Sequence, residues 1–139
     1  MRVHDLPDET ATVALAQSLA PRLRSGDVLG LDGPLGAGKT TFTRGLVAAL
    51  GGDPIMVASP TFTLLHQYAC QPPMLHLDAY RLSGPGDLAG LGFDELMEVG
   101  AIAVIEWAER VESALVGWRV WRLRFAHVAT GRQVEVFEP

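Results

Sequence analysis

The chain has 139 residues, of which 48% are apolar and 19% are charged, and its net charge is −5. This composition is typical of a globular protein, and we expect one domain spanning residues 1–139. A negative net charge disfavours charge-driven binding to nucleic-acid phosphates, and the single cysteine, Cys70, excludes an internal disulfide framework. No signal peptide is recognisable and no apolar run approaches the ~20 residues of a membrane span, so we expect a cytoplasmic protein without membrane partners.

The first predicted element is a helix that begins near Asp8-Glu9-Thr10, where a short polar side chain can cap it and acids suit its first turn. Leu15, Leu19 and Leu23 form its apolar stripe, which Pro21 interrupts. The apolar run Val28-Leu29-Gly30-Leu31 then predicts a buried strand.

That strand leads into a glycine-rich loop, Gly33-Pro34-Leu35-Gly36-Ala37-Gly38-Lys39-Thr40, which has the pattern G-x-x-x-x-G-K-T. Glycines allow backbone N–H groups to approach phosphate oxygens. Lys39 would reach the β- and γ-phosphates, and the Thr40 hydroxyl would bind Mg²⁺. Lys39 is also the only lysine beside ten arginines, and a compact ammonium is what a closed phosphate loop requires.

A helix follows the loop, because Phe42, Leu46 and Leu50 recur at four-residue spacing before Gly51-Gly52. The segment Ser59-Pro60-Thr61-Phe62-Thr63 has two interpretations: its hydroxyls close over a γ-phosphate or a magnesium-bound water, or they only shape a turn.

Two strands, 64–69 and 74–78, are predicted on either side of a turn at 71–73, which indicates an antiparallel hairpin. Asp78 ends the second of these apolar runs, and Glu106 ends the run 101–105. Ligands of open α/β sheets bind beyond the carboxyl ends of the strands. We therefore expect the two acids to hold Mg²⁺ or to orient a water, although each could simply end its strand in solvent.

Short helices are predicted at 88–92, 94–98 and 108–112, and a final strand at 133–137 after a turn at 130–131. From Trp118 onward apolar and polar residues alternate, as in a strand with two different faces. Trp121, Leu123 and Phe125 form an apolar face, and Arg122 and Arg124 form an arginine face. The arginine face is either solvated or a docking surface for an acidic partner or an RNA backbone.

The histidines His66, His76 and His127 lack metal-ligand spacing, so we interpret each as structural, with His76 notable for its proximity to Asp78. Trp107 follows a candidate catalytic acid and is interpreted as a packing residue near the site.

These residues together resemble the bacterial TsaE (formerly YjeE) family, the ATPase of tRNA threonylcarbamoyladenosine biosynthesis. The P-loop alone is shared by many families, whereas further segments, in this order, are more specific. They are Glu9-Thr10, Ser59-Pro60-Thr61-Phe62, His76-Leu77-Asp78-Ala79-Tyr80-Arg81-Leu82 and Ile105-Glu106-Trp107. The resemblance implies an α/β fold, a single-domain P-loop NTPase with a mixed parallel/antiparallel central sheet flanked by helices.

The resemblance also assigns roles to residues. Thr61 falls in the family's switch-like loop, Asp78 on its Walker-B-like aspartate, and Glu106 on the acid that contacts magnesium together with Thr40. The catalytic candidates are therefore Lys39, Asp78, Glu106 and Thr61, and the metal-binding candidates are Thr40, Glu106 and Asp78. The expected nucleotide contacts are Thr10, Leu35, Gly36, Ala37, Gly38, Lys39, Thr40, Thr41 and Arg132.

The implied cofactors are ATP and Mg²⁺, and the absence of a guanine-specific N-K-x-D segment also favours ATP. The implied partners are the proteins TsaB and TsaD. The resemblance implies that the family resets their complex and does not itself catalyse threonylcarbamoyl transfer, with tRNA contacted only indirectly. Two alternatives remain: a small-molecule kinase and a nucleotide-gated binding module. A kinase usually needs an arginine-bearing lid, and after the P-loop helix only Arg81 and Arg110 precede residue 119.

One position departs from the family pattern. Pro34 stands where the family usually has an acid after the first P-loop glycine, and proline removes a backbone donor. The position lies early in the loop, so we expect nucleotide binding to survive with altered affinity.

Overall fold

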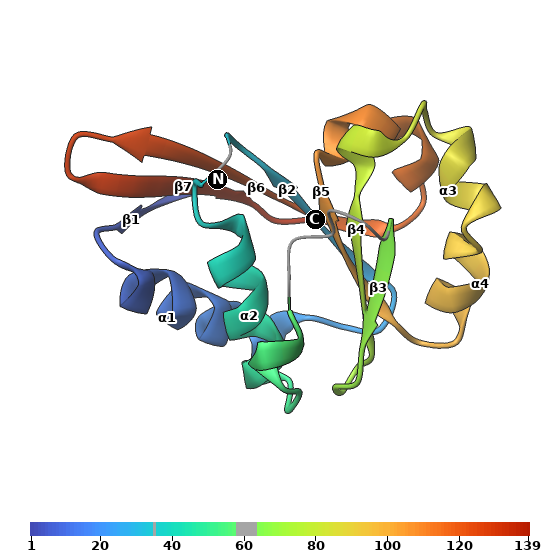
Figure 1. The fold of residues 1–139 in the computed structure, drawn as a ribbon, viewed down its shortest axis with the longest axis horizontal. Coiled ribbons are helices and arrows are strands. Elements are labelled where there is room, and N and C mark those ends of the chain that lie inside the picture. The colour runs from blue at the N-terminus through green and yellow to red at the C-terminus, as the bar shows by residue number, and fades with distance from the viewer. Residues whose placement is uncertain (35, 58–63) are drawn as a thin grey trace.

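The computed structural model describes residues 1–34, 36–57 and 64–139, and within these residues seven strands form one sheet in the order β1-β7-β6-β2-β5-β4-β3 (Figure 1). The strands are β1 (Arg2–Leu6), β2 (Asp27–Asp32), β3 (Leu65–Tyr68), β4 (Met74–Asp78), β5 (Ile102–Glu106), β6 (Arg119–Val128) and β7 (Gly131–Phe137). The α-helices are α1 (Glu9–Leu19), α2 (Lys39–Ala49), α3 (Gly86–Gly90) and α4 (Phe93–Glu98). The 3₁₀ segments are η1 (Ala20–Arg22), η2 (Pro54–Met56), η3 (Ala79–Arg81) and η4 (Ala108–Leu115).

The centre of the sheet is parallel and its edges are antiparallel. Strands β6, β2, β5 and β4 run in parallel, whereas β3 pairs with β4, β7 with β6 and β1 with β7 in antiparallel fashion. This arrangement confirms the predicted mixed α/β sheet and the hairpin formed by β3 and β4. Parallel strands must be covered on both faces, which explains why β5 is buried throughout and β4 is buried from Met74 to Leu77.

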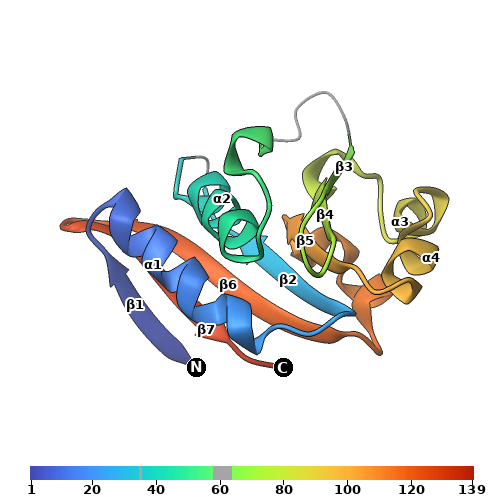
Figure 2. The ribbon, with the colours of Figure 1, turned by 90° about the horizontal axis from the view of Figure 1, so that it is seen from below.

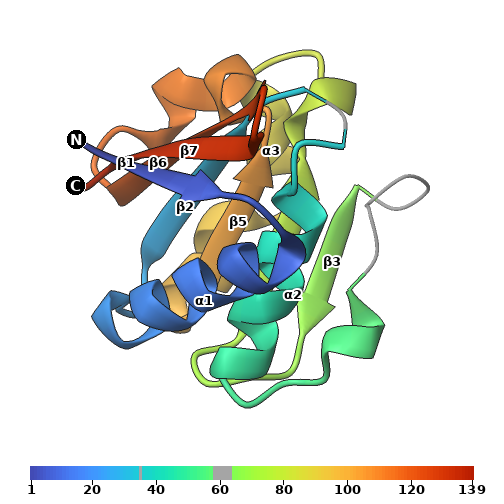
Figure 3. The same cartoon turned by 90° about the vertical axis from the view of Figure 1, so that its left-hand side faces the viewer.

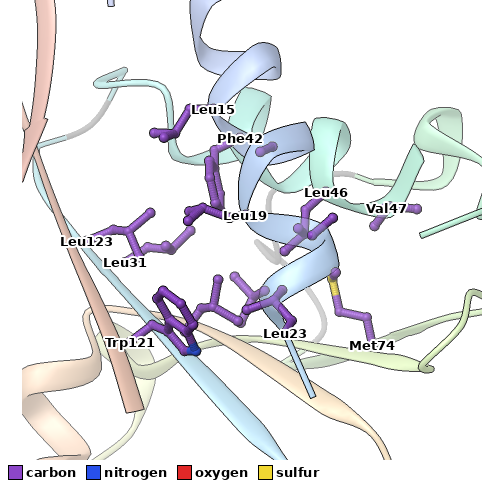
Figure 4. Packing of buried hydrophobic residues seen from close by; sticks show 14 of the residues in the cluster. Leu15, Leu19, Leu23, Leu31, Phe42, Leu46, Val47, Met74, Trp121 and Leu123 are labelled. Atoms are coloured by element: carbon purple, nitrogen blue, oxygen red, sulfur yellow. The ribbon is translucent and has the colours of Figure 1, made fainter. Parts of the chain in front are cut away.

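Two apolar layers cover the sheet. Helices α1 and α2 lie side by side over one face (Figures 2 and 3), where Phe42 and Leu46 pack with Leu31 and Leu123 (Figure 4). Helices α3 and α4 and segment η4 supply the apolar side chains that cover the other face. The sheet therefore separates two cores, and the predicted apolar face of β6 points into the first of them.

Local chemistry sets the position of α1. Asp8 caps this helix, since its Oδ1 accepts a hydrogen bond of 2.9 Å from the amide of Ala11. Helix α1 then packs closely on α2 at Gly45, where an added Cβ would lie 3.1 Å from the Cβ of Ala16 and 3.2 Å from the Cα of Val13. Glycine at this position lets the two helices approach each other.

Asp27 ties the first residue of β2 to β6. Its carboxylate is buried and accepts hydrogen bonds from the Arg119 guanidinium at 2.7 Å and from Trp121 Nε1 at 3.1 Å. Burial alone would raise the pKa of Asp27, but these hydrogen bonds and one from the Arg24 amide outweigh it, so the pKa lies below its ordinary value.

The structure differs from the sequence predictions at several elements; β7, for example, begins at Gly131, two residues before the predicted start. Strand β1 was not predicted, because of its five residues only Leu6 is buried and no apolar alternation marks it. Helix α3 begins at Gly86, two residues before the predicted start. The short helix predicted after Trp107 is present as the 3₁₀ segment η4, which is broken at Val111 and extends to Leu115. None of the helices in the described residues is long and apolar enough to cross a membrane.

Candidate functional site

The glycine-rich loop connects buried strand β2 to helix α2, as predicted. Three of its glycines have positive φ angles, including +76° at Gly36 and +106° at Gly38, a region of the backbone that residues with side chains rarely adopt. Gly33 has φ +146°, and an added Cβ there would lie 2.6 Å from the carbonyl oxygen of Phe125. The backbone therefore requires glycine at these positions, and it directs the loop onto the N-terminus of α2, where unpaired N–H groups favour anions.

Lys39, the first residue of α2, is buried beneath the loop. Its Nζ donates a hydrogen bond of 2.7 Å to the carbonyl oxygen of Gly33 and lies 3.9 Å from Glu106 Oε1. The same ammonium lies 4.7 Å from the centroid of the Trp107 ring, within the range of a cation–π contact. Because an ammonium carries three donors, two remain for a ligand after the bond to Gly33.

A cavity of about 280 Å³ adjoins this lysine. It is lined by Gly36, Gly38, Lys39, Thr40, Thr41, Asp78, Glu106, Trp107 and Arg132. The structure thus brings together most of the residues predicted to contact the nucleotide and the metal. Their roles remain predictions.

Among the residues that the structure describes, two predicted nucleotide contacts, Thr10 and Ala37, do not line this cavity. Thr10 is exposed in the first turn of α1, and Ala37 is fully buried under the loop. Helix α1 approaches the loop through Thr12 instead, whose Cγ2 would lie 4.0 Å from a Cβ added at Gly38. Leu35 and Thr61 lie outside the described residues, as does the whole Ser59–Thr63 segment with its two interpretations.

The two acids come together because their strands are parallel neighbours in register. Asp78 of β4 pairs with Glu106 of β5, so both carboxylates lie at the same edge of the sheet. Asp78 Oδ1 accepts a hydrogen bond of 3.0 Å from the Tyr80 amide, which orients the carboxylate and starts η3. Glu106 is more deeply placed, and its Oε2 lies 2.8 Å from Nε2 of the buried His76.

Trp107 is the one residue other than glycine with a positive φ among the described residues (φ 59°, ψ 41°). Its amide donates to the carbonyl of Leu31 at 3.0 Å, and its ring packs on Tyr80 with centroids 5.2 Å apart. A left-handed backbone at a bulky residue costs about 1–2 kcal/mol. The surrounding contacts hold this conformation and direct the ring toward Lys39, so Trp107 is a wall of the site.

Of the two arginines on the predicted arginine face of β6, Arg122 forms ion pairs within the molecule. Arg122 pairs with Asp32 and with Glu112, each at 2.8 Å. Burial would lower its pKa, but these partners outweigh burial and raise the pKa above its ordinary value. Arg124 is exposed and its guanidinium lies 5.2 Å from the Phe137 ring. Arg122 therefore braces Asp32, the residue before the P-loop, and is a poor candidate for docking.

The donor set fits a polyphosphate with a divalent cation. The loop offers a helix N-terminus and a buried ammonium for phosphate, and an added Cβ at Gly36 would meet nothing within 4 Å, so the cradle is open. The Thr40 hydroxyl and the two carboxylates are the hard oxygen ligands that Mg²⁺ prefers, and that ion keeps several waters in addition.

A parallel-centred sheet in which a G-x-x-x-x-G-K-T loop joins a buried strand to a helix is a P-loop type of α/β fold. A family model described as "Threonylcarbamoyl adenosine biosynthesis protein TsaE" matches residues 6–134. The chain belongs to the TsaE family, which is named for threonylcarbamoyladenosine biosynthesis.

Individual relatives agree with this family. The chain is similar to the tRNA threonylcarbamoyladenosine biosynthesis protein TsaE of Rickettsia conorii, with 40% identity covering 81% of this chain and 65% of the relative. The Bacillus subtilis protein of the same name is 42% identical over 78% of this chain and 66% of its own length. The chain thus spans about two thirds of the length of these relatives. The crystal structure of Bacillus subtilis YdiB aligns with a TM-score of 0.72 and 30% identity, covering 96% of this chain and 80% of that one.

Sequence reasoning missed one part of the site, the contact between His76 and Glu106. His76 lacks metal-ligand spacing and was interpreted as structural, but it lies two residues before Asp78, on the same face of β4. Only the register between β4 and β5 shows that this face is shared with Glu106.

Proposed function

We propose that this chain binds ATP with Mg²⁺ and hydrolyses it slowly, as an accessory ATPase of threonylcarbamoyladenosine formation in tRNA. In this proposal it resets a complex of TsaB and TsaD, and it meets tRNA only through those partners. The observation that carries the proposal is the convergence of the chain's single lysine with two strand-end carboxylates in one cavity.

Nucleotide binding rests on the loop and the start of α2. Backbone amides from Gly36 to Thr41 would surround the phosphates, and the two free donors of Lys39 would bind β- and γ-phosphate oxygens. Arg132, which lines the same cavity from β7, adds a second positive charge. Trp107 limits the access of water to the Lys39 side of the cavity, which strengthens the electrostatic contacts there.

Metal binding rests on Thr40, Glu106 and Asp78. A bound Mg²⁺ would offset the negative charge of the phosphates and align them for attack by water. Glu106 and Asp78, already oriented by His76 and by the Tyr80 amide, would hold the ion directly or through water and orient the attacking water. Thr61 retains its predicted role near the γ-phosphate.

Lysine substitution tests this function. Lys39→Ala removes the buried ammonium, and we expect loss of tight ATP binding in calorimetry, because the phosphate charge then lacks its main partner. Lys39→Arg is the matched variant: it keeps the charge but not the compact ammonium, so it should also bind poorly. Arg24→Ala, at an exposed position outside the cavity, controls for the loss of one positive charge and should bind like wild type. Tight ATP binding by Lys39→Ala would overturn the assignment.

A further inference from the structure

A buried polar chain runs from β3 through β4 to the candidate metal-binding acid on β5. Tyr68 Oη lies 3.0 Å from His76 Nδ1, and His76 Nε2 lies 2.8 Å from Glu106 Oε2. His76 is 0% exposed and Tyr68 6%, so neither side chain is hydrated in the way that a surface group would be. Three polar groups from three adjacent strands thus form one hydrogen-bonded line that ends at the cavity.

Strand geometry explains why these residues meet. His76 and Asp78 are two residues apart and share a face of β4, and Glu106 occupies the same face of the parallel neighbour β5. Met74, Ile102 and Val104 lie on this face too, within the apolar core covered by α2. The polar line therefore crosses an apolar layer, where a buried polar group without a partner costs about 1–3 kcal/mol.

The chemistry of the three groups determines which atom donates and which accepts in each hydrogen bond. A Glu106 carboxylate can only accept, so His76 Nε2 must carry a proton and donate to Oε2. In the neutral imidazole, Nδ1 then accepts from the Tyr68 hydroxyl, and every group is satisfied. Oε2 is held by His76, while Oε1 is the oxygen that faces Lys39, 3.9 Å from its Nζ.

We propose that His76, held by Tyr68, is a positioning residue for Glu106, and that it fixes the carboxylate so that Oε1, on the Lys39 side of the cavity, would be available to a divalent cation bound with the nucleotide. This inference rests on the proposed function. Carboxylates that bind metals are commonly oriented by such outer hydrogen bonds, and their loss typically lowers metal affinity or activity about 10–100-fold. Without the hydrogen bond from His76, the Glu106 carboxylate would be free to rotate, and Oε1 would no longer be held in one orientation on the Lys39 side of the cavity.

The test compares ADP binding by calorimetry in the presence of Mg²⁺ and in the presence of EDTA. His76→Leu removes the donor and keeps an apolar side chain in the core. We expect ADP affinity in EDTA to be unchanged and the affinity gained from Mg²⁺ to fall about 10–100-fold. His76→Gln retains an N–H donor near the position of Nε2 and should restore most of that gain. Tyr68→Phe should also reduce the affinity gained from Mg²⁺, but by less than His76→Leu does, since His76 is still present.

His66→Leu is the matched control. His66 is the cross-strand partner of His76 on β3, but it is only partly buried and does not line the cavity. It should retain the full Mg²⁺-dependent gain. A merely structural role for His76 would lower the melting temperature of His76→Leu without changing the ratio of the two ADP affinities, and that result would overturn the inference.

Thermal unfolding is measured for each variant. If His76→Leu does not fold, Tyr68→Phe decides, because it deletes only one hydroxyl: an unchanged Mg²⁺ gain in that variant contradicts the inference. Wild-type protein that gains no ADP affinity from Mg²⁺ would contradict the proposed metal site itself, and the inference with it. Wild-type protein that shows the gain, together with His76→Leu that shows the same gain, contradicts the positioning role alone.

Discussion

At the scale of single residues, the site depends on a few buried polar side chains whose partners are specific. Lys39, Glu106 and His76 are each less than a tenth exposed, and each has a polar or aromatic neighbour from another element. Lys39 and Glu106 could be identified as site candidates from the sequence, because Lys39 belongs to a motif and Glu106 ends an apolar run. Their contacts could not, because the Glu106–His76 pair joins residues 30 positions apart on different strands.

Glu106 gives the first residue-level prediction. Glu106→Gln removes the negative charge and keeps an oxygen that can accept from His76, so the fold should be preserved. We expect ATP binding without metal to remain and Mg²⁺-dependent hydrolysis to fall by at least about tenfold, as when a metal-site group is lost. Phosphate release is the measurement, and Glu109→Ala, an exposed acid three residues further on, is the control. Normal hydrolysis by Glu106→Gln would remove Glu106 from the metal site.

Asp27 gives a prediction for stability against pH. Its pKa is lower in the folded protein than in the unfolded chain, so its stabilising effect is present above the unfolded value and is lost as pH falls toward the folded value. Asp27→Asn loses the charge-assisted bonds to Arg119 and Trp121, and we expect it to lower the free energy of unfolding by about 1–3 kcal/mol at neutral pH.

Denaturant unfolding at neutral pH and in acid checks this expectation. The difference between wild type and Asp27→Asn should narrow as pH falls below about 4, where the unfolded carboxyl binds a proton. Asp94→Asn, an exposed acid of α4, should stay close to wild type throughout. A difference that is constant with pH would show that the charge of Asp27 does not contribute.

At the scale of elements, the helices and strands that were predicted best are those with a periodic pattern of apolar residues. Helices α1 and α2, the buried strands β2, β4 and β5, and the alternation of β6 all appear, but Leu23 of the stripe predicted for α1 lies beyond the helix, after the interruption at Pro21. Strand β1 escaped prediction because backbone pairing with β7, rather than a buried side-chain pattern, holds it. The helix predicted after Trp107 is present as η4, but its 3₁₀ type could not be predicted, because apolar spacing alone does not distinguish the two helix types.

The packing of α1 on α2 carries a prediction at this scale. Gly45→Leu would place a side chain where only 3.1–3.2 Å separates an added Cβ from Ala16 and Val13, so the helices must move apart. We expect a loss of about 1–3 kcal/mol in the free energy of unfolding, the usual effect of overpacking. Ala49→Leu, exposed on the same helix, is the control for added volume and should be nearly neutral. Thermal and denaturant unfolding would measure both, and equal stabilities would contradict the close helix contact.

At the scale of the whole molecule, the parallel centre of the sheet determines where chemistry can occur. Strands β2, β4 and β5 deliver the P-loop, Asp78 and Glu106 to one edge, and α2 covers the face from which His76 and Glu106 approach Lys39. The class of fold and the location of the cavity could therefore be predicted from the order of motifs. Which hydroxyl or carboxylate faces its neighbour depends on strand register and side-chain rotamers, which no local pattern encodes.

The most direct test of the central claim is ATP hydrolysis by the purified protein, alone and with TsaB and TsaD from the same organism. We predict slow, Mg²⁺-dependent release of phosphate by the protein alone and a several-fold rise when both partners are present. Turnover that the partners leave unchanged, or ADP formation that requires a small-molecule acceptor instead of water, would contradict the account and favour a binding module or a kinase, respectively.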